Sequence, residues 1–292
     1  MADNSLPDVT RPVCRHYGGK WRLAPWIISH FPAHELYIEP FGGAASVLLR
    51  KQPAKVEIYN DINRYAVNLF RVLQDRELSA RLIDMFHLTL YASEELRRAA
   101  DLRDHPDPVV RAWGFVVRSA FSIAATEKPN ASGFDNNPRN GRTIRENRVV
   151  PWNNYPRSLK ATIERLKRVR IENKDAIKLI SNFTREYADE ALVYCDPPYL
   201  LSARSGGPQY RHEIDRDYHI RLGEAVKGSK MMFLISGYES ELYADLYKGW
   251  RVVSKEARTI AKSKRTECLW ISPNADRKLQ AVRDRPGLFK NG

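Results

Sequence analysis

The chain has 292 residues, and its 48 lysine and arginine residues exceed its 35 aspartate and glutamate residues, so its formal net charge is +13. Hydrophobic residues make up 43% of the sequence, which is enough for a sizeable core and excludes a mainly disordered chain. No apolar run approaches the roughly 20 residues of a membrane span, the first residues lack a signal peptide, and the three cysteines form neither a disulfide framework nor a metal motif. We therefore expect a soluble, cytoplasmic protein without a membrane partner or a metal, and the charge favours a polyanionic partner.

The first 75 residues predict two strand-helix pairs. Residues 35–39 are rich in strand formers and run into the turn Pro40–Gly43, after which residues 44–50 have a helix-forming composition. Residues 56–59 repeat the strand signal. Apolar residues then recur at helical spacing over 62–74.

The character of the sequence changes after this unit. Residues 76–127 predict helices, whereas 128–157 are rich in Asn, Arg, Gly and Pro and show almost no periodicity. Over 128–172 there are 11 lysine and arginine residues against 4 acidic ones, and 251–292 has the same two counts. Each segment therefore has a net charge of +7, which is typical of a solvated loop or of a segment that contacts a phosphate backbone.

The second half predicts further strands and helices. Strands are expected at 169–171, 191–194, 231–235 and 268–271, and helices near 213–227 and 239–246. This alternation predicts an α/β fold, with a largely parallel sheet covered by helices.

The glycine turn Phe41-Gly42-Gly43-Ala44-Ala45 follows the first predicted strand. Such a turn lets the backbone approach a ligand, and Asp61, 18 residues after Gly43, is placed to accept hydrogen bonds from both hydroxyls of a ribose. The phosphate-binding patterns GxxxxGK[ST] and GxGxxG are absent, which disfavours ATP and NAD. Together these features favour another nucleoside cofactor.

The tetrapeptide Asp196-Pro197-Pro198-Tyr199 directly follows a predicted strand. The two prolines make the segment stiff, so it presents a carboxylate, a carbonyl and an aromatic ring in one cluster. A carboxylate and a carbonyl that accept the N–H groups of a conjugated amine stabilise the positive charge that develops when the amine attacks an electrophile. The tyrosine ring can stack on a base that has left the duplex.

The motifs resemble one family when they are taken in order. Tyr17-Gly-Gly-Lys20, Glu39-Pro-Phe-Gly-Gly43, Asn60-Asp-Ile-Asn63 and Asp196-Pro-Pro-Tyr199 resemble those of Dam-like DNA adenine N6-methyltransferases of the alpha group, over roughly 15–75 and 165–272. The resemblance implies a Rossmann-like methyltransferase fold, S-adenosylmethionine as methyl donor and no metal. Compact phage and prophage members are the most similar in arrangement.

The resemblance also implies roles for individual residues. The catalytic residues would be Asp196, Pro197, Pro198 and Tyr199. The cofactor-binding residues would be His16, Tyr17, Lys20, Glu39, Phe41, Gly42, Gly43, Asp61, Asp175 and Asp196. Within this set, Lys20 would contact the cofactor, Asp61 its ribose, and Asp175 would border its adenine.

The sequence departs from the family pattern in three places. His16 stands where the family has an aromatic residue, and Ala45 stands where its glycine turn has a further glycine. We expect the extra methyl group of Ala45 to narrow the approach of the methionine part of the cofactor. The middle region lacks the family's segments for reading GATC, so the recognition sequence cannot be carried over.

We therefore predict a catalytic domain in two parts, 1–75 and 161–292, with an inserted, mostly helical DNA-recognition domain over 76–160. The expected partner is double-stranded DNA, from which a target adenine is flipped, and the protein is expected to be a monomer or a homodimer. Alternatives are methylation of cytosine N4, of RNA adenine or of a glutamine side chain. A further alternative is a DNA-binding regulator on a decayed enzyme scaffold, which His16 and Ala45 motivate.

Overall fold

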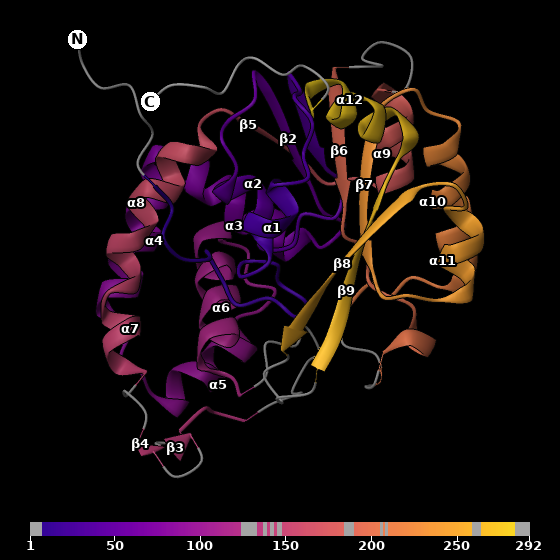
Figure 1. The fold of residues 1–292 in the computed structure, drawn as a ribbon. Coiled ribbons are helices and arrows are strands. Elements are labelled where there is room, and N and C mark those ends of the chain that lie inside the picture. The colour runs from indigo at the N-terminus through magenta and orange to yellow at the C-terminus, as the bar shows by residue number, and fades with distance from the viewer. Residues whose placement is uncertain are drawn as a thin grey trace.

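The computed structural model describes residues 8–283 apart from 124–132, 137–138, 141–142, 145–147, 184–189, 205–206, 208–209 and 259–263. A seven-stranded sheet in the order β5-β2-β1-β6-β7-β9-β8 forms its centre (Figure 1). In chain order its strands are β1 (Leu36–Glu39), β2 (Val56–Asn60), β5 (Val169–Glu172), β6 (Ala191–Cys195), β7 (Met232–Gly237), β8 (Arg251–Arg258) and β9 (Lys264–Ile271). A separate two-stranded ribbon consists of β3 (Arg139–Asn140) and β4 (Thr143–Ile144).

The strand order reverses in the middle of the sheet. The chain begins at β1 and passes outward through β2 and β5, then returns to β6 on the other side of β1; all of these pairs are parallel. The next strand outward, β7, is also parallel to β6, whereas β9 lies antiparallel between β7 and β8. This arrangement confirms the predicted α/β fold of the Rossmann-like methyltransferase type.

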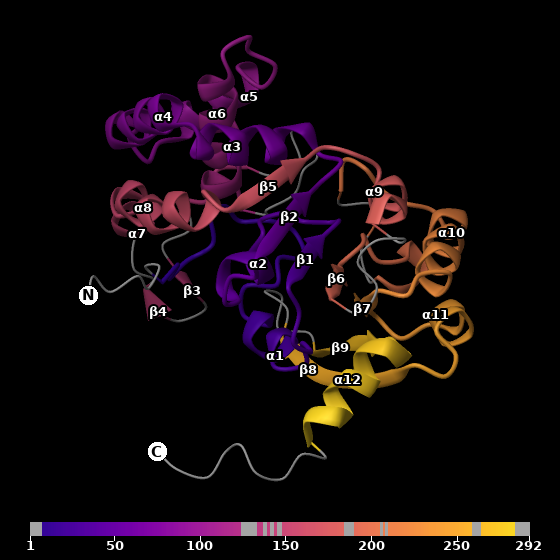
Figure 2. The ribbon, with the colours of Figure 1, turned by 90° about the horizontal axis from the view of Figure 1, so that it is seen from above.

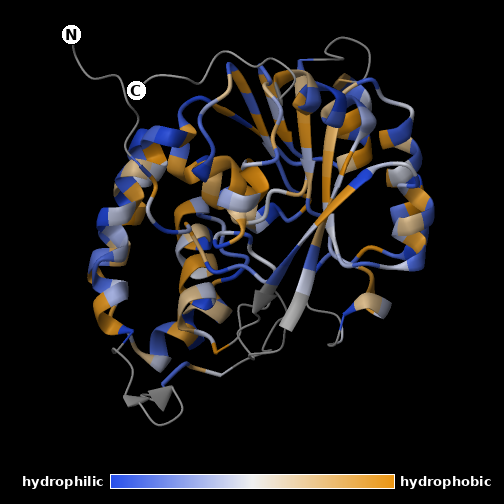
Figure 3. Cartoon of the chain, in the orientation of Figure 1, coloured by the Kyte–Doolittle hydropathy of each residue, from blue (hydrophilic) through white to orange (hydrophobic). Residues whose placement is uncertain are grey.

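Helices cover both faces of the sheet, because successive side chains of a buried strand point to opposite faces. In β1, Tyr37 packs in one core cluster, whereas Leu36 and Ile38 pack in the other. The first face carries α1 (Ala24–Ile28), α2 (Ser46–Arg50), α3 (Arg64–Gln74) and α12 (Pro273–Arg283). The second face carries α9 (Ala176–Phe183), α10 (Arg216–Lys227) and α11 (Glu241–Leu246), as Figure 2 shows from above. Hydrophobic residues are concentrated in the sheet and on the inward helix faces (Figure 3).

A further layer of helices packs outside α3. It consists of α4 (Arg76–Leu88), α5 (Ser93–Asp101), α6 (Pro108–Phe121), α7 (Val149–Asn153) and α8 (Tyr155–Leu166). The buried side chains of Trp113 and Trp152 belong to the same cluster as Leu48 of α2 and Tyr59 of β2. This layer and the adjacent face of the sheet therefore share one core. Within the part of the chain that the structure describes, no helix is both long and apolar enough to cross a membrane.

The predicted elements agree with the structure where the hydrophobic pattern is strong. Helices fill most of 76–121, and six of the seven strands of the sheet lie at predicted positions. The strand β8 was not predicted, because it is an edge strand in which Arg251, Lys255, Glu256 and Arg258 interrupt the apolar pattern. The domain boundaries at 75 and 160 stay a prediction; residue 160 lies within α8.

A buried ionic cluster joins α8 to β2 and α2. Both carboxylate oxygens of Glu57 accept bonds from the guanidinium of Arg165, and Oε1 also accepts one from Lys51 Nζ at 2.7 Å. Arg165 further donates to the carbonyl oxygen of Leu48 at 2.8 Å. Burial alone would raise the pKa of Glu57, but Arg165 and Lys51 hold it below its ordinary value. The carboxylate thus stays charged in the core, and its stabilising effect is lost only when the pH falls through this lowered pKa.

Removing one member of this cluster should destabilise the whole fold. In Arg165→Met, the Glu57 carboxylate stays buried with the single cation of Lys51, and breaking a buried pair in this way typically costs about 3–5 kcal/mol. We expect the free energy of unfolding in urea to fall by about this amount at pH 7.

Arg168→Met is the matched control, because Arg168 is exposed on the turn after the same helix. Its effect should stay within about 0.5 kcal/mol. Equal unfolding free energies for the two variants would contradict the structural role of Arg165.

Candidate active site

The candidate site lies at the carboxyl edge of the sheet, where the strand order reverses. The chain leaves β1 toward α2 on one face and leaves β6 toward α10 on the other. Divergent connections of this kind open a crevice between two parallel strands, and ligands of α/β proteins bind there. A pocket of about 320 Å³ lies in this crevice.

Four neighbouring strand ends each place a carboxyl group against this pocket. Glu39 is the last residue of β1, Asp61 and Asp196 directly follow β2 and β6, and Asp175 lies three residues beyond β5. Because these strands are parallel, their ends meet at one edge, and segments far apart in sequence converge there. The pocket is acidic although the protein as a whole is basic.

Hydrogen bonds to β2 hold the glycine turn after β1 in place. Gly42 N–H donates to the Asn60 carbonyl at 2.8 Å, and the Tyr59 hydroxyl donates to the Gly43 carbonyl at 2.8 Å. A Cβ atom at residue 42 would lie 2.1 Å from the Tyr59 ring, and one at residue 43, where φ is 49°, would lie 3.0 Å from the His16 ring. Both glycines are therefore required by close packing, and Gly43 also by its left-handed conformation.

Ala45 differs from the expectation based on the sequence. It adopts a left-handed conformation, with φ of 52°, directly before α2. Its side chain is fully buried in the core, and the pocket is lined by its neighbour Ala44 instead. Having alanine instead of glycine at residue 45 therefore costs about 1–2 kcal/mol of backbone strain but takes no space from the pocket. The expectation that Ala45 narrows the approach of the methionine part of the cofactor was wrong.

Glu39 is a buried acid that is protonated near neutral pH. Its Oε2 accepts hydrogen bonds from the Tyr37 hydroxyl at 2.8 Å and from Leu48 N–H at 3.0 Å. Burial raises the pKa of Glu39 to about 8 despite these two bonds. Glu39 therefore offers the pocket a largely neutral carboxylic acid at pH 7.

Asp61 and Asp175 are ordered by neighbouring donors. The two Asp61 oxygens accept the backbone N–H groups of Gly43 and Asn63, each at 2.7 Å. Asp175 accepts from Lys178 N–H at 3.0 Å, at the start of α9, and from the Tyr218 hydroxyl at 2.8 Å. Each carboxylate thus keeps a fixed orientation while it lines the pocket.

Asp196, which is partly buried, lies against the buried side chains of Lys20 and Tyr199. The Lys20 ammonium lies 3.0 Å from Asp196 Oδ1 and 4.7 Å from the centre of the Tyr199 ring. Burial raises the pKa of Asp196, although Lys20 limits the rise. Burial alone would lower the pKa of Lys20, but the carboxylates of Asp196 and Glu267 raise it above its ordinary value.

The structure brings most of the predicted residues together. The pocket is lined by His16, Tyr17, Lys20, Glu39, Phe41, Gly42, Gly43, Asp61, Asp175, Asp196 and Pro198. Pro197 and Tyr199 do not line it, and Tyr199 is 8% exposed. Most of the predicted residues therefore line the pocket, whereas Pro197 and Tyr199 lie outside its lining, next to Asp196.

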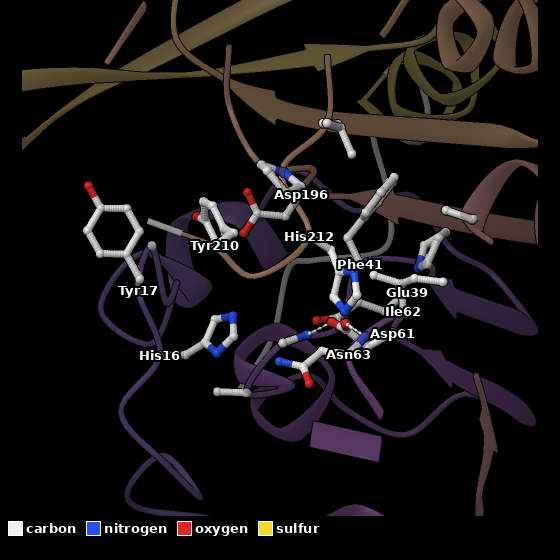
Figure 4. Close-up of a pocket in the computed structure, with 18 of the residues that line it drawn as sticks. His16, Tyr17, Glu39, Phe41, Asp61, Ile62, Asn63, Asp196, Tyr210 and His212 are labelled. Carbon is white, nitrogen blue, oxygen red and sulfur yellow. Dashed lines mark hydrogen bonds between the residues drawn. The ribbon is translucent and has the colours of Figure 1, made fainter. Parts of the chain in front are cut away.

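One wall of the pocket was not predicted. It is lined by Tyr210, His212, Glu213, Ile214, Asp215, Tyr218 and Arg221. Figure 4 shows Tyr210 and His212 among the side chains that line the pocket with Asp61 and Asp196. Tyr210 meets Tyr17 edge to face, with ring centres 5.5 Å apart. The aromatic residues 210 and 218 were the available signal, but they follow no strand and match no spacing rule.

A comparison with protein families gives one match to most of the chain. Residues 16–260 match the family described as D12 class N6 adenine-specific DNA methyltransferase. A DNA adenine methylase of Serratia marcescens is 27% identical over 268 residues, which cover 84% of this chain and 90% of that protein. A DNA adenine methylase of Escherichia coli K12 is 24% identical over 258 residues, covering 84% and 87%.

Solved structures give weaker matches. A SAM-dependent methyltransferase of Agrobacterium tumefaciens has a TM-score of 0.35 and 10% identity, covering 87% of this chain and 60% of that one. A score this low supports no conclusion about the site. The predicted similarity to phage members stays a prediction.

The protonated state of Glu39 gives a testable change of stability with pH. Its raised pKa means that the folded protein binds a proton that the unfolded chain releases above about pH 4.5, so its contribution to stability falls as the pH rises toward 8. Glu39→Gln keeps an oxygen acceptor for Tyr37 and Leu48 without the ionisation.

The variant should therefore gain stability relative to the native protein between pH 5.5 and pH 9, measured as the difference in unfolding free energy. Glu35→Gln, an exposed change just before the same strand, should show no such trend. A constant difference for Glu39→Gln across this range would show that Glu39 is ionised in the fold.

Proposed function

The chain belongs to the D12 class N6 adenine-specific DNA methyltransferases, and we propose that it transfers the methyl group of S-adenosylmethionine to N6 of an adenine in double-stranded DNA. The observation that supports this most directly is the position of the Lys20 ammonium. An N–H donor already contacts both the Asp196 carboxylate and a face of the Tyr199 ring. A target adenine would use the same surroundings, with its amino group at Asp196 and its ring on the face of Tyr199.

The pocket fits the proposed cofactor in size and charge. Its volume of about 320 Å³ is within the usual range of small-molecule sites, roughly 300–1,000 Å³. S-Adenosylmethionine has a sulfonium and an ammonium cation. Besides the neutral Glu39, the pocket lining has five carboxylates (Asp61, Asp175, Asp196, Glu213 and Asp215) against the three cations of Lys20, Lys174 and Arg221. When bound, it supplies a methyl group on positively charged sulfur that a nucleophile can attack.

The chain offers distinct partners for the parts of this cofactor. Asp61 accepts the backbone N–H groups of Gly43 and Asn63, and a carboxylate has about four acceptor sites, which suits the two ribose hydroxyls. Ile62 lines the same pocket with 48% of its surface exposed, so it provides an apolar wall for the adenine ring beside Asp175. His16, Tyr17 and Lys20 would hold the methionine part.

Asp196 would carry the main electrostatic role in the transfer. Its carboxylate would accept one N–H of the target amino group, and the Pro197 carbonyl would accept the other. Positive charge develops on this nitrogen during attack, and a carboxylate fixed in a buried site stabilises it more than water would. For the amine to enter, Lys20 has to leave Oδ1 of Asp196.

The duplex would lie along the basic segments. In the sheet, residues 264–267 of β9 extend beyond its pairing with β7 and continue with β8 as a two-stranded ribbon. This ribbon and the α5 end of the helical layer point to the same side of the molecule (Figure 1). Part of the basic stretch 128–172 and the residue Lys262 lie outside the described residues.

Replacing the proposed catalytic carboxylate should abolish methylation. Asp196→Ala should slow single-turnover methyl transfer to unmethylated genomic DNA by at least about 100-fold, because it removes the charge that stabilises the attacking amine. Mass spectrometry of the nucleosides should detect N6-methyladenine with the native protein. Asp217→Ala, an exposed change in α10, should act like the native protein. An active Asp196→Ala variant, or N4-methylcytosine as the product, would contradict the proposal.

Cofactor binding can be tested separately by calorimetry. The native protein should bind S-adenosylmethionine without DNA, and Asp61→Ala should weaken binding by about tenfold or more, since a charged hydrogen bond contributes about 1.5–3 kcal/mol. Asp84→Ala, an exposed change in α4, is the control. If the native protein bound DNA but no cofactor at high micromolar concentration, it would be a DNA-binding regulator instead.

A further inference from the structure

A glutamate on a distant strand lies directly behind the proposed catalytic tetrapeptide. Glu267 of β9 is 8% exposed, and its Oε2 accepts a hydrogen bond from the Tyr199 hydroxyl at 2.7 Å. It does not line the pocket, so contact with the cofactor does not explain its position. Burial of a carboxylate without a compensating partner is costly, which makes this hydrogen bond a defined feature rather than a surface contact.

The antiparallel direction of β9 places this side chain at the site. Cys268 pairs with Gly237, the last residue of β7, so Glu267 lies just beyond the carboxyl end of that strand. The site is at the carboxyl end of the adjacent strand β6, from which Tyr199 follows. A parallel strand in this position would begin at the opposite edge of the sheet.

Tyr199 has further contacts, among them a side-chain hydrogen bond with Asp196, the residue that would receive the target amino group. Tyr238 meets the ring edge to face with centres 4.6 Å apart, and the Lys20 ammonium lies over its face. Lys20 has to move when a base enters. The hydrogen bond to Glu267, at 2.7 Å, is a polar contact of Tyr199 with a residue that takes no part in binding the amine.

We propose that Glu267 is a positioning residue for methyl transfer, which holds the Tyr199 hydroxyl and thereby fixes the aromatic face on which the target base stacks. The inference rests on the proposed function, since it assigns Tyr199 as the stacking partner. Glu267 touches neither the base nor the cofactor in this scheme. Its loss should slow the transfer step while cofactor binding stays unchanged.

Three variants test the hydrogen bond. Glu267→Ala removes the acceptor, Glu267→Gln keeps an oxygen acceptor, and Tyr199→Phe removes the donor but keeps the ring. We expect the single-turnover rate of methyl transfer at saturating cofactor to fall about 10- to 100-fold in Glu267→Ala, in the range of a misplaced reacting group. Glu267→Gln should stay within about threefold of the native rate, as expected if its oxygen still accepts the bond.

The combined variant distinguishes positioning from a general loss of structure. Glu267→Ala should add no further slowing when Tyr199 is already Phe, because the two variants remove the same bond. Binding of S-adenosylmethionine, measured by calorimetry, should remain within about threefold in all variants. Glu224→Ala, an exposed change in α10, is the matched control and should have the native rate.

The outcomes separate this inference from the proposed function. A native protein that does not methylate DNA overturns the proposed function. If the native protein is active, a native rate in Glu267→Ala, or equal slowing in the Ala and Gln variants, overturns the role of Glu267. Should Glu267→Ala fail to fold, Tyr199→Phe takes its place, and a native rate in that variant overturns the role.

Discussion

Four carboxyl groups lie close together at the ends of four parallel strands, and the structure of the site depends on how each of them is stabilised. Like charges in a partly buried pocket oppose one another, so each group needs its own solution. Glu39 keeps its proton, Asp61 accepts two backbone amides, and Asp175 uses a helix start and a tyrosine hydroxyl. Asp196 pairs with the Lys20 ammonium at 3.0 Å, and the proposed chemistry is assigned to it.

Ion pairs also link segments that are far apart in the chain. Lys20 belongs to the N-terminal segment before β1, whereas Asp196 follows β6 in the second half. On the other side of β1, Arg165 from α8 reaches Glu57 on β2. The first ion pair thus joins the parts of the chain that precede and follow the helical layer, and the second joins that layer to the sheet. They make the sheet and that layer cooperate in positioning the site, which a shared hydrophobic core alone does not specify.

Much of the site could be predicted because its residues follow strands at fixed, local offsets. The tetrapeptide 196–199, the glycine turn and Asp61 are each readable from a few neighbouring residues, and parallel pairing brings them together. Glu267 was not predicted, because its position depends on the register in which β9 pairs with β7. The residues between these two strands have no sequence pattern that predicts this register. The wall from Tyr210 to Asp215 was missed for a related reason, since a loop that folds back over a pocket has no periodicity. The protonation of Glu39 depends on burial, which a sequence pattern does not measure.

The reversed direction of β9 also has a consequence for how this architecture can diverge. Strands β8 and β9 extend past the edge of the sheet as a ribbon, and residues 268–271 remain anchored beside β7. The ribbon tip can therefore change in length, charge or shape through insertion and substitution while the anchored half of β9 stays in place. A single fold could acquire new DNA preferences in this way without rebuilding its reaction centre. Selection on target choice would then act on the ribbon, whereas selection on chemistry would act on Glu267, at the point where the ribbon joins the anchored residues.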